Sequence, residues 1–303
     1  MISSYACTNI ILRNTSAMVK LYLQSSPQMK YNDVSKLFVA CLASILMIAC
    51  APKADTLVIL HTNDTHSQVE PIAPGKRDGN HAGYARRLGI IQQEREKYPN
   101  LILVDAGDFS QGTPYFNFYH GRVEIDAMNR MGYDAVTLGN HEFDNGVDTL
   151  AQVLKDAQFA VVSANYDVQG TPLEGLVHPY TVFTRAGIRV GILGVGVNPH
   201  GLISEKNFAP VQYLEPFSAA QKAATELKMK HHCDVIICLS HLGTHVDEEL
   251  AKQSKYIDVI VGGHTHKIVT NHYVENSEGN NVLLTQMGKS GARIGKISVQ
   301  MQE

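Results

Sequence analysis

The sequence predicts an α/β fold, because short apolar runs alternate along the chain with amphipathic helical patterns. The 303 residues, 44% of them hydrophobic and 18% charged, supply enough apolar mass for a sizeable core. Five of the runs lead directly into Asp, His or Asn residues, and they cover residues 56–60, 101–104, 135–138, 235–239 and 257–261. Because the loop at the carboxyl end of a buried strand is free of the sheet, these five tips are where chemistry is expected.

The segments between the runs predict the remaining elements. Three helical patterns are expected at residues 82–98, 147–158 and 216–231. Two extended pieces, 180–184 and 189–195, flank a short polar turn and predict a hairpin. Residues 281–285 and 292–300 alternate between apolar and polar side chains and predict antiparallel strands. No internal repeat or low-complexity linker divides the chain.

The first 49 residues predict an N-terminal extension plus a signal peptide. Lys30 and Lys36 precede an apolar stretch, 37–49, that stops at Cys50. The stretch is too short for a transmembrane span. Residues 47–50 resemble a bacterial lipobox, which predicts an exported, envelope-bound protein with a lipidated Cys50, periplasmic or surface-facing; the alternative is a plain signal peptide with an incidental cysteine. Met29 is a better start than Met1, so residues 1–28 are interpreted as a start-site artefact.

Residues 50–303 remain as one mildly acidic domain. Excess negative charge argues against a nucleic-acid polymer as partner. Cys233 and Cys238 lack the spacing of a disulfide framework, and Cys238 lies within an apolar run as an expected buried thiol. Disulfides are therefore not expected to stabilise the fold.

The spacing of polar residues at the tips predicts a metal site. Asp64 and His66 are two residues apart, so in extended backbone both side chains would point the same way. His264 and His266 repeat this spacing at the last tip. Asp108 follows a glycine, which permits a sharp turn and a close approach of the carboxylate.

Asn140 and His141 are adjacent, so we expect the Asn140 amide to face a metal and His141 to face the substrate. Carboxylate, imidazole and amide ligands without thiolate suit Mn, Fe, Zn or Co. The expected ligands are Asp64, His66, Asp108, Asn140, His241, His264 and His266. The other histidines are expected to be packed or at the surface: His61, His81, His120, His178, His200, His231, His232, His245 and His272.

The sequence Gly-Asn-His-Glu at 139–142, with Gly-Asp at 107–108 and Gly-Gly-His-Thr-His at 262–266, resembles the calcineurin-like metallophosphoesterases. The segments 60–66 and 140–144 are similar to the 5′-nucleotidase branch, which includes UDP-sugar hydrolases and cyclic-nucleotide phosphodiesterases. The resemblance spans about residues 56–300. It implies a four-layer α/β/β/α sandwich of two mixed sheets.

The resemblance also implies roles for the tip residues. One divalent ion would take Asp64, His66, Asp108 and His266, and the other would take Asp108, Asn140, His241 and His264. A metal-bound hydroxide would attack a phosphoryl group. His141 would donate to the departing oxygen, with Asp144 orienting it; the alternative for Asp144 is a helix N-cap. Glu142 is interpreted as a supporting or structural residue.

The expected activity is 5′-nucleotidase-type phosphomonoester hydrolysis. A phosphodiesterase acting on 2′,3′-cyclic or other diesters is the alternative within the class. A non-catalytic metal-binding lipoprotein would not need His141 and Asp144, and a β-lactamase-type zinc hydrolase would want consecutive histidines in place of residues 139–141.

Two departures from the family pattern bear on specificity. Two-domain 5′-nucleotidases have a C-terminal domain whose aromatic residues stack the base, and this chain ends at Glu303. The protein is then expected to be a broad phosphatase, to use a separate polypeptide for that domain, or to come from a truncated gene. Residues 83–87 resemble a segment near the family's site, but Arg86 and Arg87 are expected to be solvated.

Overall fold

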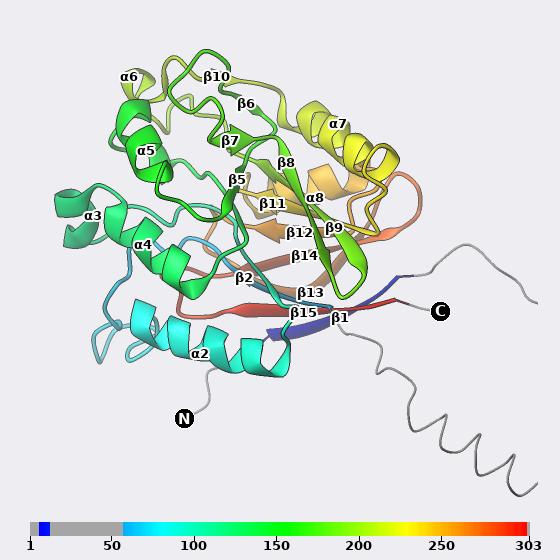
Figure 1. Cartoon of the computed structure of the whole chain (residues 1–303), viewed down its shortest axis with the longest axis horizontal. Helices are drawn as coiled ribbons and strands as arrows, with labels where there is room; N and C mark the ends of the chain where they lie inside the picture. The colour runs from blue at the N-terminus through cyan, green and yellow to red at the C-terminus, as the bar shows by residue number, and fades with distance from the viewer. Residues whose placement is uncertain (1–5, 13–56, 302–303) are drawn as a thin grey trace, which may run out of the picture.

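The computed structural model of the chain describes residues 6–12 and 57–301. Two large sheets lie face to face between groups of helices (Figure 1). The first half contributes β1 (Ala6–Leu12), β2 (Leu57–Thr62), α2 (Tyr84–Lys97), β3 (Ile102–Asp105), α3 (Pro114–Tyr119), α4 (Arg122–Met131), β4 (Ala135–Thr137), the 3₁₀ turn η2 (His141–Phe143), α5 (Val147–Leu154), β5 (Ala160–Val162), β6 (Tyr166–Asp167) and β7 (Val177–His178). The second half contributes β8 (Tyr180–Arg185), β9 (Ile188–Val195), α6 (Glu205–Phe208), β10 (Gln212–Tyr213), α7 (Pro216–Met229), β11 (Val235–Ser240), α8 (Thr244–Gln253), β12 (Val259–Gly262), β13 (Ile268–Glu275), β14 (Asn281–Met287) and β15 (Gly295–Met301).

Both large sheets are mixed. The first has the order β1-β15-β2-β3-β4-β5-β7, in which β2 to β7 run parallel and β15 runs antiparallel to β2. The second has the order β13-β14-β12-β11-β9-β8, with parallel central strands and antiparallel strands at both edges. A short ladder of β6 and β10 stands apart. The tips of β2, β3 and β4 therefore meet at one edge, and those of β11 and β12 at another.

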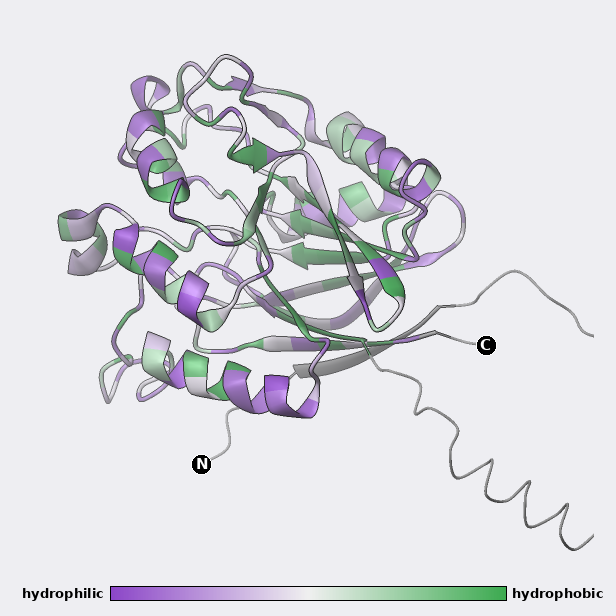
Figure 2. Cartoon of the chain, in the orientation of Figure 1, coloured by the Kyte–Doolittle hydropathy of each residue, from purple (hydrophilic) through white to green (hydrophobic). Residues whose placement is uncertain are grey.

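Three apolar layers hold the four-layer sandwich together. Alternation along β2 sends Leu57 and Ile59 between the sheets and Val58 and Leu60 towards the helices. The helix layer over the first sheet comes from α2, α4 and α5, and that over the second sheet from α7 and α8. Figure 2 shows hydrophobic colour concentrated in the central strands and mixed colour on the helices. The α/β/β/α sandwich of two mixed sheets predicted from the resemblance is confirmed.

Most predicted elements are present. The three predicted helices are shorter than expected, whereas strands β8, β9, β11 and β14 are slightly longer. The hairpin of β8 and β9 is antiparallel, as predicted. The two C-terminal strands each have an antiparallel neighbour, but they lie in different sheets, and β14 also runs parallel to β12. Helices α3, α4 and α8 and strand β13 were not predicted. Strand β1 lies within residues 1–28, which were expected to lie outside the domain, but it pairs with β15 at the edge of the first sheet.

The predicted signal segment at residues 37–49 and the predicted lipidation site Cys50 lie outside the described residues. Within residues 6–12 and 57–301, every helix is too short or too polar to cross a bilayer.

Candidate metal centre

Loops from both sheets converge where the parallel strands end, and they bring six ligand-type side chains into two groups. We call Asp64, His66 and His266 the outer cluster, and Asp108, His241 and His264 the inner cluster. In each cluster the potential ligand atoms lie within 4.8 Å of one another. Each cluster combines residues from both sheets, so packing of the two sheets is what assembles the site.

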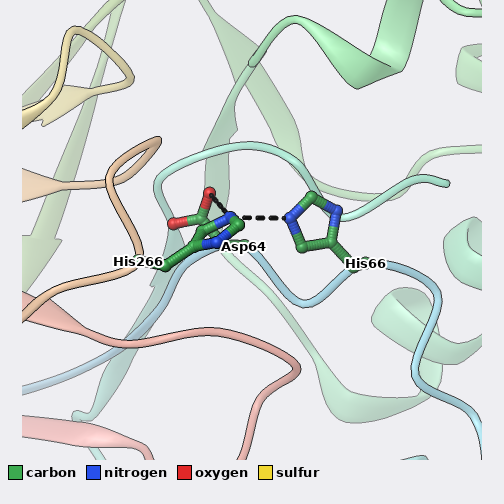
Figure 3. A group of neighbouring side chains, drawn as sticks. All are labelled: Asp64, His66 and His266. Carbon is green, nitrogen blue, oxygen red and sulfur yellow. Dashed lines mark hydrogen bonds and ion pairs between the residues drawn. The ribbon is translucent and has the colours of Figure 1, made fainter. Parts of the chain in front are cut away.

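The outer cluster brings two imidazoles together edge to face, with an angle of 85° between the ring planes of His66 and His266. The Nε2 atoms of His66 and His266 are 3.0 Å apart, and His266 Nε2 lies 3.4 Å from Asp64 Oδ1. Figure 3 shows the three side chains turned towards one another. Without a cation, one ring donates to the other, and the donor depends on the tautomer. Two imidazole nitrogens and a carboxylate oxygen this close together are also a ligand set that suits a divalent cation. The outer cluster therefore has the chemistry of a metal site.

The inner cluster is more deeply buried. His241 Nε2 lies 3.1 Å from Asp108 Oδ2, and both side chains are at most 3% exposed. His241 Nδ1 donates to the carbonyl oxygen of Ala106 at 2.7 Å, which leaves Nε2 free to act as a ligand. Burial lowers the pKa of His241, but the carboxylates of Asp108 and Asp64 raise it more, to about 10. The inner cluster therefore attracts a positive charge strongly.

The backbone at the tips differs from the predicted extended conformation. Asp64, His66, His264 and His266 have φ values of 49°, 45°, 70° and 53°, all in the left-handed region. Asp108 also has a positive φ, of 54°, and follows Gly107 at 87°. The side chains converge, but the spacing of two residues in an extended strand is the wrong reason. Strained backbone of this kind concentrates at functional sites.

Asn140 supplies an independent indication of a missing partner. Its amide oxygen is buried and has no hydrogen-bond partner within the described residues. A buried, unpaired amide oxygen costs about 1–3 kcal/mol unless a ligand satisfies it. Asn140 directly precedes His141, whose backbone N–H donates to Asp108 Oδ1 at 2.9 Å. The backbone next to Asn140 therefore lies beside the inner cluster, and the unpaired amide oxygen fits the role of an additional oxygen ligand.

His141 and Asp144 form a hydrogen-bonded pair on the solvent side of the clusters. His141 Nδ1 lies 2.9 Å from Asp144 Oδ2, and both side chains are about one-third exposed. The hydrogen bond to Asp144 raises the pKa of the His141 imidazole. Burial lowers this pKa by a smaller amount, so the net shift is upward. Asn207 donates to the carbonyl oxygen of Asp144 at 2.8 Å. The alternative that Asp144 caps the next helix is wrong, because Gly146 is the N-cap of α5 and makes no side-chain cap.

Glu142 joins two of the tips. Its carboxylate accepts backbone N–H bonds from Asp108 at 2.9 Å, Gly139 at 2.6 Å and Ser110 at 3.0 Å. Burial and the nearby Asp108 charge raise the pKa of Glu142 to about 7. Sequence reasoning left its role open between supporting and structural. The three bonds show how it fixes the Asp108 turn against the Asn140 loop.

The remaining histidines lie outside both clusters, as expected. His61 is buried, with Nε2 3.3 Å from Thr285 Oγ1, and burial lowers its pKa to about 3. It is therefore a neutral packed side chain.

A four-layer sandwich with two ligand clusters at the strand tips defines a metallophosphoesterase-type α/β protein. The chain belongs to the calcineurin-like phosphoesterase family, whose model matches residues 57–268. The resemblance noted from the tip motifs is confirmed.

Two named relatives and one solved structure are similar to most of this chain. The chain is 35% identical to a snake venom 5′-nucleotidase of Gloydius brevicauda in an alignment of 268 positions that covers 80% of this chain and 45% of that protein. It is 31% identical to the trifunctional nucleotide phosphoesterase YfkN of Bacillus subtilis, over 82% of this chain and 18% of that protein. The solved structure of a 5′-nucleotidase precursor from Thermus thermophilus superposes with a TM-score of 0.71 at 38% identity, covering 78% and 49% of the two chains. The chain thus spans less than half the length of these relatives.

Proposed function

We propose that the protein is a dinuclear-metal phosphoric-ester hydrolase of the 5′-nucleotidase type, acting on phosphomonoesters. The observation that carries the proposal is the position of the His141–Asp144 pair beside two clusters of metal-ligating side chains. A binding protein would need the clusters alone. The pair adds a group that can move a proton next to them.

The proposed ligand sets share one carboxylate. Asp64, His66, Asp108 and His266 would hold one ion, and Asp108, Asn140, His241 and His264 the other. When bound, two divalent cations lower the pKa of a coordinated water and neutralise charge on phosphoryl oxygens. The absence of thiolate among these side chains favours Mn, Zn, Fe or Co.

His141 is proposed as the proton donor. Its ring centroid lies 5.5 Å from that of His66, so the imidazole borders the outer cluster. Asp144 engages Nδ1, which leaves Nε2 to face a substrate. A proton on Nε2 would pass to the departing alkoxide oxygen, and Asp144 would hold the ring and stabilise its charged form.

Nucleotides are the proposed substrates, since the relatives are named as 5′-nucleotidases or nucleotide phosphoesterases. Phosphate release would be measured from 5′-nucleotides, sugar phosphates, p-nitrophenyl phosphate and its bis ester, with Mn²⁺, Zn²⁺ or Mg²⁺ and a chelator control. Metal-dependent release from monoesters supports the proposal. Release from diesters and cyclic nucleotides alone would favour the phosphodiesterase, and no release at all would contradict both.

Export and a lipidated Cys50 are proposed from the sequence of residues 37–50. Three acyl chains give stable anchoring, whereas one gives only marginal binding. Incorporation of labelled fatty acid by the parent, and its loss in Cys50→Ala, would support the lipoprotein. Unchanged membrane association of Cys50→Ala would contradict it.

A further inference from the structure

Helix α2 contains a buried arginine, Arg87, to which the proposed function assigns no role. Arg87 is 3% exposed, whereas its neighbour Arg86 is exposed, so the expectation that both are solvated is wrong for Arg87. Within residues 57–300, Arg87 is the only buried Arg or Lys, against seven buried acids: Asp64, Glu94, Asp105, Asp108, Glu124, Glu142 and Asp247. A buried charge is costly unless it is paired or hydrogen-bonded, so its partners are informative.

A line of buried polar side chains leads from this arginine to the metal centre. Burial raises the pKa of the Tyr133 hydroxyl to about 12, and the charge and hydrogen bond of the nearby Arg87 guanidinium lower it. That hydroxyl lies 2.7 Å from Thr62 Oγ1, which in turn donates to Asp105 Oδ2 at 2.5 Å. The other oxygen of Asp105 accepts the backbone N–H of Gly107 at 2.9 Å. The residue after that glycine is the carboxylate proposed to bridge the two ions.

The chemistry of the groups fixes the direction of this chain. A guanidinium only donates and a carboxylate only accepts, so Tyr133 accepts from Arg87 and donates to Thr62. Every hydroxyl dipole then points from the cation towards Asp105, and aligned bonds in a buried setting reinforce one another. Burial raises the pKa of Asp105 to about 6, while the Thr62 and Gly107 hydrogen bonds and the Arg87 charge act in the opposite direction.

Arg87 also packs against the other side of the centre. It lies so close to Gly291 that any side chain there would collide with Nη2. The preceding residue, Ser290, donates its backbone N–H to the carbonyl oxygen of Asp64 at 2.7 Å. The Nε and Nη2 atoms of Arg87 have no hydrogen-bond partner within the described residues. The guanidinium therefore acts through Tyr133, through its charge and through this packing.

We propose that Arg87 is a positioning residue of the metal centre, acting on the Asp108 turn through Tyr133, Thr62 and Asp105. The inference rests on the proposed function, because it assumes that the centre binds metal. Loss of a direct outer partner of a metal ligand weakens metal affinity by about 10–100-fold, and Arg87 lies several groups further out, so the low end of that range is expected. The arginine is too far along the chain of bonds to be a ligand, so its removal should weaken metal binding while all seven proposed ligands remain.

The test is a calorimetric titration of Mn²⁺ into the chelator-treated full chain. Arg87→Met removes the charge and the donor, and the exposed Arg86→Met on the same helix is the matched control. Tyr133→Phe removes one hydroxyl from the chain of bonds while Arg87 stays, and Tyr180→Phe, whose hydroxyl bonds Glu226 away from the centre, is its control. We expect about 10-fold weaker Mn²⁺ binding in Arg87→Met, a smaller loss in Tyr133→Phe, and parental affinity in both controls.

The outcomes are distinguishable. A purely structural role would lower the Tm of the metal-free variants and leave the Mn²⁺ affinity of the folded protein unchanged, which would overturn the proposal. If Arg87→Met does not fold, the comparison of Tyr133→Phe with Tyr180→Phe decides. If the parent itself binds no Mn²⁺, the proposed function fails; if the parent binds and both variants bind as tightly, only the role of Arg87 fails.

Discussion

The inner and outer clusters use the same kinds of side chain but differ in burial and support. His241 of the inner cluster is fully buried, whereas His266 of the outer cluster is 36% exposed. The Ala106 carbonyl fixes the ring of His241, whereas Nδ1 of His66 has no hydrogen-bond partner within the described residues. An imidazole held through its second nitrogen is pre-oriented as a ligand. The inner cluster is therefore a prepared site, and the outer cluster is adjustable and open to solvent.

This difference predicts unequal metal affinity. A pre-oriented site loses less conformational freedom on binding, so the inner ion should bind more tightly and leave more slowly. The open cluster lies beside His141, where a substrate would enter. The exchangeable ion would then be the one nearest to the proton donor.

Asp108→Ala should have the largest effect, since it removes the one carboxylate proposed to serve both clusters and so abolishes the difference between them. We expect phosphatase activity to fall by at least about 10⁴-fold, as for groups that act as a unit. Elemental analysis should show both ions lost. Asp167→Ala, at the exposed residue of β6, is the control. Retention of activity in Asp108→Ala would contradict the assignment.

His141→Asn tests whether rate and metal binding are separable. The side chain is outside both clusters, so metal content should remain parental while kcat falls by about 10²–10³-fold, as expected for a general acid. Steady-state kinetics and elemental analysis on one preparation provide the measurement, with exposed His200→Asn as the control. Loss of metal together with rate would instead make His141 a ligand.

His241→Ala and His66→Ala compare the clusters directly. Removing the pre-oriented His241 should weaken metal affinity at the inner cluster by at least about 100-fold. Removing the more open His66 should weaken metal affinity at the outer cluster by about 10-fold. Activity of His66→Ala should recover at higher Mn²⁺ concentration, and that of His241→Ala should recover less. Equal recovery of the two variants would show that burial does not distinguish the sites.

Asp144→Asn should have the smallest effect, and it is visible mainly in the pH profile. The Asp144 hydrogen bond raises the pKa of His141. If the protonated ring donates, activity falls as pH rises through that pKa. Removing the carboxylate lowers the pKa, so the fall should begin about one pH unit lower. If kcat of Asp144→Asn falls at the same high pH as kcat of the parent, another group donates the proton.

Sequence patterns located the strands and the tip residues but not their partners. The runs before Asp64 and Asp108 are buried on both faces, so their apolar pattern cannot reveal which sheet each joins. The prediction that Asp64 and His66 converge through extended backbone reached the right residues for the wrong reason, since both adopt left-handed φ values. Such conformations depend on tertiary contacts, which a local pattern does not contain.

Burial of charged residues was the least predictable feature. The helical pattern around Arg87 gives no reason to expect a buried guanidinium, because its partners Tyr133 and Gly291 are distant in sequence. Glu142 could have been recognised as a clamp only from the three backbone N–H groups that surround it. Local periodicity predicts elements, whereas these roles arise from the meeting of separate loops.

Counting metal ions per chain is the most direct test of two unequal sites at converging strand tips. The chelator-treated protein would be titrated with Mn²⁺ by calorimetry, and the saturated protein then followed by elemental analysis during timed exposure to chelator. We predict two ions per chain at saturation, bound in two steps and released in two phases, with His66→Ala accelerating only the faster phase. Saturation at one ion or none, or a single release phase that His66→Ala leaves unchanged, would contradict the account.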